Sequence, residues 1–308
     1  MTRLIAILPF VLTALTATVP AVSAPVTEVS ACGAVLSAPG KYSMPADLLA
    51  CPGAAIVIAA SEVSLDLKGN EITCDRADGR LDVGVLGSGV SAVHVRNGRI
   101  SGCDIGVQVV GVTDSEITDL SIQLSAMDAA LGIGGAAILL VGSDHNAVIG
   151  NRATENIIGI GIFNSHDNQV TGNVTSENVG EGPIFFGMGI ALSAFSSGNS
   201  LRGNEARFNS DAGIVLSVGV SGTTVRGNEV SDNGFYGIGA FRRIDLGAPP
   251  TQNNLIQGNS SLANGRADLV EVLFDPLANP RESTEELCRN TWKDNTHVSL
   301  IGPPDCVR

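Results

Sequence analysis

Five short segments of the chain share one pattern of apolar and polar positions. Each has an apolar residue two positions before a Gly-Asn pair, and a further Asn five residues after that pair. The segments are 146–156, 168–178, 199–209, 223–233 and 254–264. Their Gly-Asn pairs recur at intervals of 22, 31, 24 and 31 residues. A period in this range indicates a stack of repeated structural units.

The residues between the Gly-Asn pairs predict short β-strands. Most repeats continue into a Gly-apolar-x-apolar segment, at 159–162, 189–192, 213–216 and 237–240. No unit contains the ten or more residues of helical periodicity that a helical repeat or a βαβ crossover needs. Gly and Asn tolerate positive φ and therefore suit sharp bends between strands. Right-handed coils of about 22 residues, stacked about 4.8 Å apart, meet these conditions.

The pattern therefore predicts an all-β fold, a single-stranded right-handed parallel β-helix. The last Asn of each repeat falls at one phase, which predicts a hydrogen-bonded amide ladder along the axis; its members are Asn156, Asn178, Asn209, Asn233 and Asn264. Looser alternation extends the helix to residues 54–274, enough for roughly eight to ten coils. Solenoid ends expose unpaired strands, so we expect caps at 25–53 and 275–308.

The N-terminal segment 1–24 has the features of a signal peptide. It carries Arg3, then an apolar run over 4–19, and small residues at 22–24. An alternative is lipoprotein-type processing at Cys32, which follows Val-Ser-Ala. No other stretch reaches the roughly 18 apolar residues of a membrane span. We expect an exported protein, periplasmic or secreted, with no transmembrane segment.

The six cysteines form an even set of the kind found in disulfide-bonded exported proteins. Six cysteines allow fifteen connectivities, and sequence neighbours favour Cys32–Cys51, Cys74–Cys103 and Cys288–Cys306. Two of these bridges, Cys32–Cys51 and Cys288–Cys306, would staple the ends of the helix.

Composition narrows the range of partners. With 44% apolar residues the chain has ample surface to bury, which excludes a disordered protein. Its 18 Lys and Arg against 31 Asp and Glu give a net charge of −13. Such a surface repels phosphate backbones and anionic membranes, so nucleic-acid binding is not expected.

The repeats resemble those of exported, pectate-lyase-like right-handed β-helix proteins with NosD/PbH1-type coils. Further features that carry the resemblance are Cys32-Gly33, Tyr42, Asp47-Leu48 and Cys51, then Leu65-Asp66-Leu67-x-Gly69, and finally Asn290-x-Trp292-x-x-Asn295. The resemblance covers nearly all of the mature chain and implies the β-helix. The family includes lyases, epimerases, glycosidases and adhesins, and its enzymes bind extended glycans along one flank.

One pair of dipeptides is the candidate for catalysis. Asp144-His145 and His166-Asp167 occupy the same repeat phase, 22 residues apart. Stacking would place Asp144 beside His166 and His145 beside Asp167, about one strand spacing apart. A histidine beside a carboxylate can abstract a sugar proton or protonate a leaving oxygen. The alternative is that these are ordinary polar turn residues.

A long excursion near residues 241–250 supplies the candidate for substrate binding. Arg242 and Arg243 could hold a uronate carboxylate, while Tyr236 or Phe241 stacks on a sugar. The alternative is a surface excursion with local salt bridges. No resident cofactor or metal is expected, although Glu155, Glu177 and Asp232 share a phase that could attract Ca²⁺.

Two functions remain open at this point. The first is action on, or binding of, an anionic polysaccharide, by β-elimination or C5 epimerisation if the protein is an enzyme. The second is a non-catalytic envelope or surface protein that binds a glycan or another protein.

Overall fold

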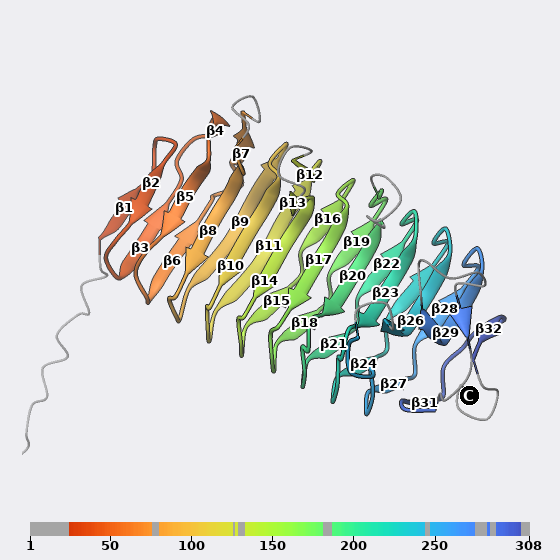
Figure 1. Ribbon diagram of the computed structural model, residues 1–308. Helices are drawn as coiled ribbons and strands as arrows, with labels where there is room; N and C mark the ends of the chain where they lie inside the picture. Colours follow the sequence, from red (N-terminus) through yellow and green to blue (C-terminus); the bar gives the residue numbers. More distant parts are fainter. Residues whose placement is uncertain are drawn as a thin grey trace, which may run out of the picture.

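The computed structural model describes residues 25–75, 80–125, 127–128, 133–180, 187–243, 247–274, 282–283 and 288–302. Within these ranges every regular element is a β-strand. The strands stack along one axis and form a rod (Figure 1). No helix in this part of the chain is long and apolar enough to cross a membrane.

The strands lie on three faces that run along the rod, which we call faces 1, 2 and 3. Face 1 holds β1 (Val26–Glu28), β3 (Gly40–Ser43), β6 (Val63–Asp66), β15 (Ala147–Ile149), β18 (Gln169–Thr171), β21 (Ser200–Arg202), β24 (Thr224–Arg226), β27 (Leu255–Gln257) and β31 (Thr291–Lys293). Face 2 holds β4 (Leu48–Cys51), β7 (Glu71–Cys74), β16 (Arg152–Thr154), β19 (Val174–Ser176), β22 (Glu205–Arg207), β25 (Glu229–Ser231) and β28 (Ser260–Leu262).

Two longer strands, β9 (His94–Ser101) and β11 (Glu116–Gln123), continue from face 1 onto face 2. Face 3 holds β2 (Ala34–Leu36), β5 (Ala54–Ile58), β8 (Val83–Ser88), β10 (Ile105–Val110), β14 (Ala136–Val141), β17 (Ile158–Phe163), β20 (Met188–Ser193), β23 (Ala212–Ser217), β26 (Tyr236–Arg243), β29 (Ala267–Phe274) and β32 (Leu300–Ile301). Two small antiparallel additions are the pair β12 (Met127–Asp128) with β13 (Ile133–Gly134), and β30 (Glu282–Ser283) on β29.

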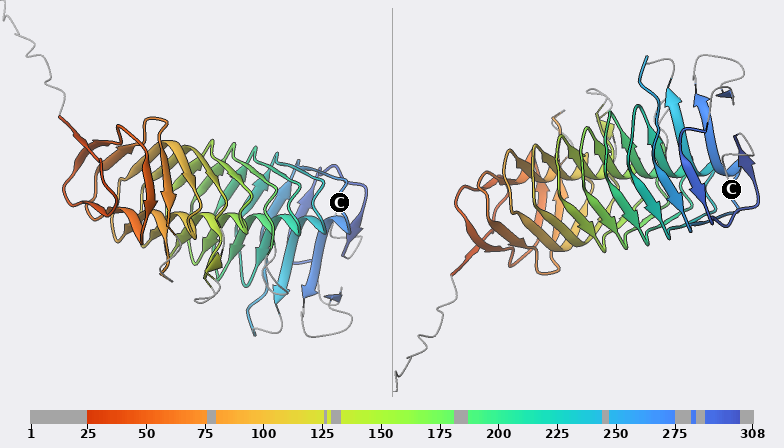
Figure 2. Two further views of the ribbon diagram at one scale, coloured as in Figure 1. Left: turned by 90° about the horizontal axis from the view of Figure 1, so that it is seen from above. Right: turned by 90° about the horizontal axis from the view of Figure 1, so that it is seen from below.

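We number the coils 1 to 11 by their described face 1 strands, from β1 to β31. Strands on each face pair in parallel with the same face of the next coil, and two views show this stacking (Figure 2). Nine face 3 strands, from β5 to β29, fall within 54–274. The predicted parallel β-helix of eight to ten coils is therefore confirmed. Strands β1 to β4, within the predicted cap 25–53, pair in the same parallel manner.

Alternation along each strand builds the core. On face 1 the inward residues stack in register from coil to coil and are at most 3% exposed; consecutive members are Leu65, Val95, Ile117, Val148 and Val170. Burial of each such side chain contributes about 1.5–3 kcal/mol. The outward residues between them are free to carry polar chemistry.

The predicted amide ladder is present at the corner between faces 2 and 3. Each Nδ2 donates to the Oδ1 of the next coil's Asn at 2.7–3.2 Å, from Asn156 through to Asn264. The other two Asn of the repeat form two more ladders. One, at the corner between faces 1 and 2, runs through Asn151, Asn173, Asn204, Asn228, Asn259 and Asn295. The other, between faces 3 and 1, runs through Asn146, Asn168 and Asn199, and resumes at Asn254 and Asn290.

Buried carboxylates end two of these ladders near the C-terminus. Asp268 Oδ1 accepts from Asn264 Nδ2 at 2.9 Å, and its Oδ2 accepts from the Ser299 backbone at 2.9 Å. Glu271 accepts from Asn290 Nδ2 at 3.0 Å and from the Trp292 indole at 2.7 Å. Burial alone would raise the pKa of Asp268, but the bonds from Asn264 and the backbone outweigh it and lower that pKa.

Two predicted disulfides are confirmed, Cys32–Cys51 and Cys74–Cys103. Each links a coil to the next one. Since the Cys32 sulfur is used in a disulfide, lipid attachment at this residue is excluded in this structure. Cys288 is also disulfide-bonded; Cys306, its predicted partner, lies outside the described residues.

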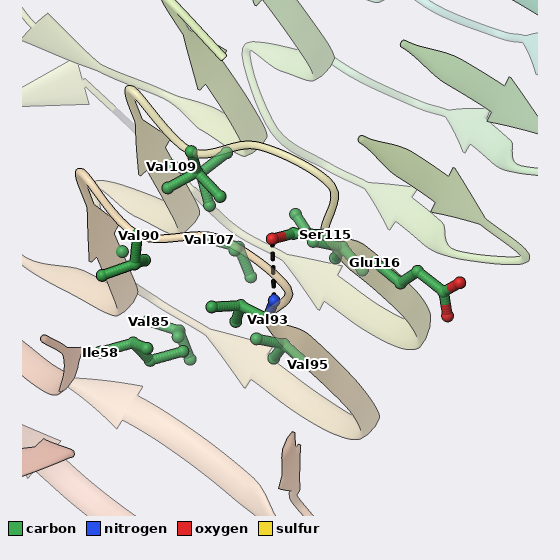
Figure 3. A pocket seen from close by; sticks show the side chains of 12 residues that line it. Ile58, Val85, Val90, Val93, Val95, Val107, Val109, Ser115 and Glu116 are labelled. Carbon is green, nitrogen blue, oxygen red and sulfur yellow. Dashed lines mark hydrogen bonds between the residues drawn. The ribbon is translucent and has the colours of Figure 1, made fainter. Parts of the chain in front are cut away.

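A small gap in the core lies between coils 2 and 5. The cavity has a volume of about 10 Å³ and is lined mainly by valines, including Val90 and Val109 (Figure 3). It can hold one water molecule at most, so it is a packing gap and not a ligand site. Figure 3 also shows Glu116 pointing away from it.

We expect Gly87→Ala to raise the free energy of unfolding by about 0.5–1 kcal/mol, because a methyl group would fill part of this cavity. Its Cβ would lie 3.6 Å from Val109 and Val112, at ordinary contact distance. The matched control is Gly106→Ala, whose Cβ would overlap the side chain of Ile122 and the carbonyl oxygen of Ala137. That change should cost about 2 kcal/mol. Urea unfolding measures both, and equal effects would contradict this account.

Candidate functional site

The four predicted catalytic residues lie in turns from face 3 to face 1, at the starts of coils 6 and 7. The Asp144 carboxylate accepts the backbone N–H of His166 at 2.7 Å, and His166 Nδ1 lies 2.7 Å from Ser197 Oγ. His145 Nε2 lies 3.9 Å from Asp167 Oδ2, with side chains 63% and 57% exposed. The stacking matches the expectation, and one of the two pairs places an imidazole near a carboxylate, in open solvent.

The backbone gives these turns a clear structural role. His145 and Asp167 have φ of 58° and 54°, in the left-handed region. The equivalent position in other coils is held by Ala92, Asp114, Gly198, Gly222 and Asn253, all with positive φ. His and Asp are therefore two of several residues that can make this turn.

The predicted substrate-binding residues lie on β26 in coil 9. Tyr236 and Phe241 are each 7% exposed and pack together, ring centroids 5.4 Å apart, in a second apolar cluster outside the main core. Their faces are covered in this structure, so neither ring is available to stack on a sugar. Arg242 is half-buried on the same strand. Arg243 ends the strand, and its side chain lies outside the described part of the chain.

A histidine–carboxylate pair that the sequence did not single out lies on face 1. His94 begins β9 and Glu116 begins β11, and the two residues are in register on adjacent coils. His94 Nδ1 lies 3.2 Å from Glu116 Oε2, and both side chains are about half exposed. This is the shortest of the described His–carboxylate pairs, and it stands on a strand face rather than in a turn.

Cationic side chains surround one carboxylate beside this pair. Arg96, two residues after His94 and on the same outward face, lies 3.3 Å from Asp66 Oδ2. Lys68 Nζ lies 3.4 Å from the same oxygen. Burial raises the pKa of Asp66, but hydrogen bonds from the Lys68 backbone and Asn97, together with the charge of Lys68, outweigh it and lower that pKa.

A shallow groove lies at the corner between faces 1 and 2 in the same coils. Its volume is about 380 Å³, and Asn97, Arg99, Asp119 and Ser121 are among the residues that line it. The groove, the cations and the His94–Glu116 pair thus occupy one region of coils 3 to 5.

The two His–carboxylate pairs follow one edge of the rod. Glu116 pairs in register with Ala147 of coil 6, and His145 precedes Ala147 by two residues. The His145–Asp167 pair therefore continues the line of the His94–Glu116 pair, two coils further along. A polymer on this edge would meet both.

Two other groups of acidic residues lie away from this edge of the rod. Glu155, Glu177 and Asp232 occupy left-handed turn positions, as does Phe208 between them, and among the described residues no group of three His, Cys, Asp or Glu could hold a metal. Asp211, on coil 8, has its pKa raised to about 6 by burial. It lies before face 3, on a different corner from the edge described above.

No curated protein sequence matches this chain. A mutant of the periplasmic alginate epimerase AlgG is 15% identical with a TM-score of 0.54, over 85% of this chain and 69% of that one. The alginate lyase from Paenibacillus sp. str. FPU-7 is 14% identical with a TM-score of 0.55, over 90% and 98%.

A tailspike protein mutant of E. coli bacteriophage HK620, in complex with a pentasaccharide, is 8% identical with a TM-score of 0.59, over 83% of this chain and 52% of that one. In three other AlgG structures, the part that matches this chain makes up 60% to 63% of the epimerase's length. Identities this low establish the fold alone. The sequence profile described as "Right handed beta helix region" matches residues 83–260, more than half of the 308 residues. The chain belongs to the right-handed β-helix family.

Proposed function

We propose that this protein is exported, binds an extended anionic polysaccharide along face 1, and acts on it with the His94–Glu116 pair. The observation that carries the proposal is the 3.2 Å contact between these side chains, on the same outward face as Arg96. Arg96 directly precedes Asn97, which lines the groove. On a protein of net charge −13, this region offers cations to an acidic sugar. The disulfides fit an exported location.

The geometry suits removal of a proton next to a carboxylate. In one tautomer His94 Nδ1–H donates to Glu116, which leaves Nε2 free to accept the C5 proton of a uronate. Glu116 then stabilises the imidazolium. Arg96 can bind the sugar carboxylate and stabilise the negative charge that develops on it. Delivery of a proton from solvent to the opposite face of C5 gives an epimer, while the imidazolium loses its proton to water. Loss of the 4-linked oxygen, which takes its proton from the imidazolium or from water, gives an unsaturated sugar.

The turn residues remain a second proposed site on the same edge. His145 with Asp167, or His166 with Asp144, would serve as the acid–base pair, and Arg242 and Arg243 would hold a carboxylate. The longer 3.9 Å distance and the left-handed backbone make this assignment weaker than the face 1 pair. Contact of Tyr236 or Phe241 with a sugar would require their cluster to open.

A non-catalytic role has one observation in its favour. The turn column that holds His145 and Asp167 accepts Ala, Gly and Asn elsewhere, so these residues need no catalytic role to be explained. A rigid solenoid that binds a glycan through face 1 would have the same structure.

The test is time-resolved proton NMR of the mature protein mixed with a panel of uronic-acid polysaccharides, with and without Ca²⁺. We expect new signals from an unsaturated or an epimerised sugar with at least one polymer. Broadening of polymer signals without new ones would establish binding and favour the non-catalytic role. A panel that shows neither change would overturn the proposal.

A further inference from the structure

We infer that Asp66 is a positioning residue, which holds Arg96 and Lys68 together on face 1 so that both cations meet a bound acidic sugar beside His94. This inference rests on the proposed function, because it concerns how the same site recognises charge. It assigns a role to a residue that no part of the proton-transfer chemistry uses.

The two oxygens of Asp66 have separate partners. Oδ1 accepts from the backbone N–H of Lys68 at 2.9 Å and from Asn97 Nδ2 at 3.0 Å. These bonds fix the carboxylate at the end of β6, where Lys68 turns the chain with φ of 55°. Oδ2 faces the Arg96 guanidinium and the Lys68 ammonium instead. The turn needs only Oδ1, so Oδ2 is left to orient the cations.

The carboxylate of Asp66 is mostly buried, whereas the two cations that it contacts are exposed. The Asp66 side chain is 13% exposed, whereas those of Lys68 and Arg96 are 57% and 53% exposed. A guanidinium has five N–H donors, and the contact with Asp66 is made through Nη2, so others remain for a second anion. Above Arg96, the next coil places the neutral Thr118 in register. A sugar carboxylate that approaches Arg96 from that side therefore meets the neutral hydroxyl of Thr118.

Stability alone does not account for the arrangement. Ion pairs in which the cation is half exposed contribute little to the free energy of unfolding, because solvent screens them and ordering long side chains costs entropy. Their effect is to restrict the directions that Arg96 and Lys68 explore. Preorganised side chains lose less entropy when a ligand binds, and this raises affinity.

The test is Asp66→Asn, which keeps an oxygen for the turn but replaces the anion with a neutral amide. We expect the association constant for mannuronate and galacturonate oligomers, measured by calorimetry, to fall about tenfold or more, while Tm stays within a few degrees. The matched control is Glu205→Gln, which breaks a comparable pair with Arg207 on coil 8 and should leave affinity unchanged. Equal affinity of the wild type and the Asp66→Asn variant would overturn the inference and leave the proposed function standing.

A second readout does not depend on the polysaccharide. In the free protein, ¹⁵N relaxation of the Arg96 Nε–H group should show larger side-chain motion in Asp66→Asn than in the wild type. Unchanged motion would overturn the inference even if no oligomer binds. Absence of binding by the wild type, with increased Arg96 motion in the variant, would count against the proposed function only.

Discussion

His94→Ala should lower the rate of any uronate elimination or epimerisation by about 100- to 10,000-fold, the usual contribution of a general base. The loss should appear mainly in kcat, because His94 is proposed to move a proton and not to hold the polymer. Glu116→Gln should have a smaller effect, since an amide can still bond to the ring but cannot balance the charge of the imidazolium. Initial rates from proton NMR measure both.

His145→Ala and His166→Ala are the matched controls for that series. Each removes an imidazole from the same edge of the rod while leaving the 3.2 Å His94–Glu116 contact in place. Turnover that survives both turn substitutions and is lost in His94→Ala would support the face 1 site. The reverse pattern would move the chemistry to the turns and overturn our assignment.

Asn204→Ala should lower the free energy of unfolding by about 4 kcal/mol, because it interrupts a buried ladder in the middle of the rod. Asn204 is 1% exposed and makes four hydrogen bonds through its side chain. It donates to Val170 O and Asn228 Oδ1, both at 2.9 Å, and accepts from Asn173 N and Nδ2, both at 3.0 Å. Alanine leaves these partners buried without it.

The chain also contains a natural gap against which to compare this loss. Thr223 occupies a ladder position, is fully buried, and its hydroxyl has no hydrogen-bond partner in the described structure. Thr223→Asn should restore the ladder between Asn199 and Asn254 and add about 1 kcal/mol. Urea unfolding followed by circular dichroism measures both variants, with the exposed Gln169→Ala as the control. A destabilising Thr223→Asn would contradict the ladder account.

The fold could be predicted from the sequence because each repeat carries its own geometry. Asn146, Asn151 and Asn156 stand five residues apart, and each one turns out to mark a corner of the coil. One ladder was predicted correctly from the sequence, and the other two were not predicted. The five-residue spacing of the Asn residues can be read from the sequence, but the number of corners in each coil cannot.

The face 1 pair was harder to find for a physical reason. Coil 4 has no Gly-Asn pair, since β9 passes continuously around the corner with Asn97 in the left-handed conformation. Without a Gly-Asn pair to mark the corner, the sequence did not show whether the His94 side chain points into the core or outward. The pairing in register with Glu116 establishes that direction. For Tyr236 and Phe241 the difficulty was the opposite one, since the sequence singled them out as sugar-stacking residues and the structure covers them. Their place beside the predicted excursion suggested that they could contact a sugar, but a second apolar cluster buries them.

The side-chain hydrogen bonds of each ladder all run from donor to acceptor in the same direction along the rod. This polarity affects how such chains can gain or lose coils in evolution. Every Asn in a ladder both receives and gives a hydrogen bond, so a duplicated coil placed between Asn151 and Asn259 would fit with no donor or acceptor left over. Asp268 and Glu271 can only receive when ionised. An Asn added to either of these two ladders beyond the carboxylate would find no proton to accept. Genetic growth of these two ladders is therefore permitted in the interior and opposed at this end.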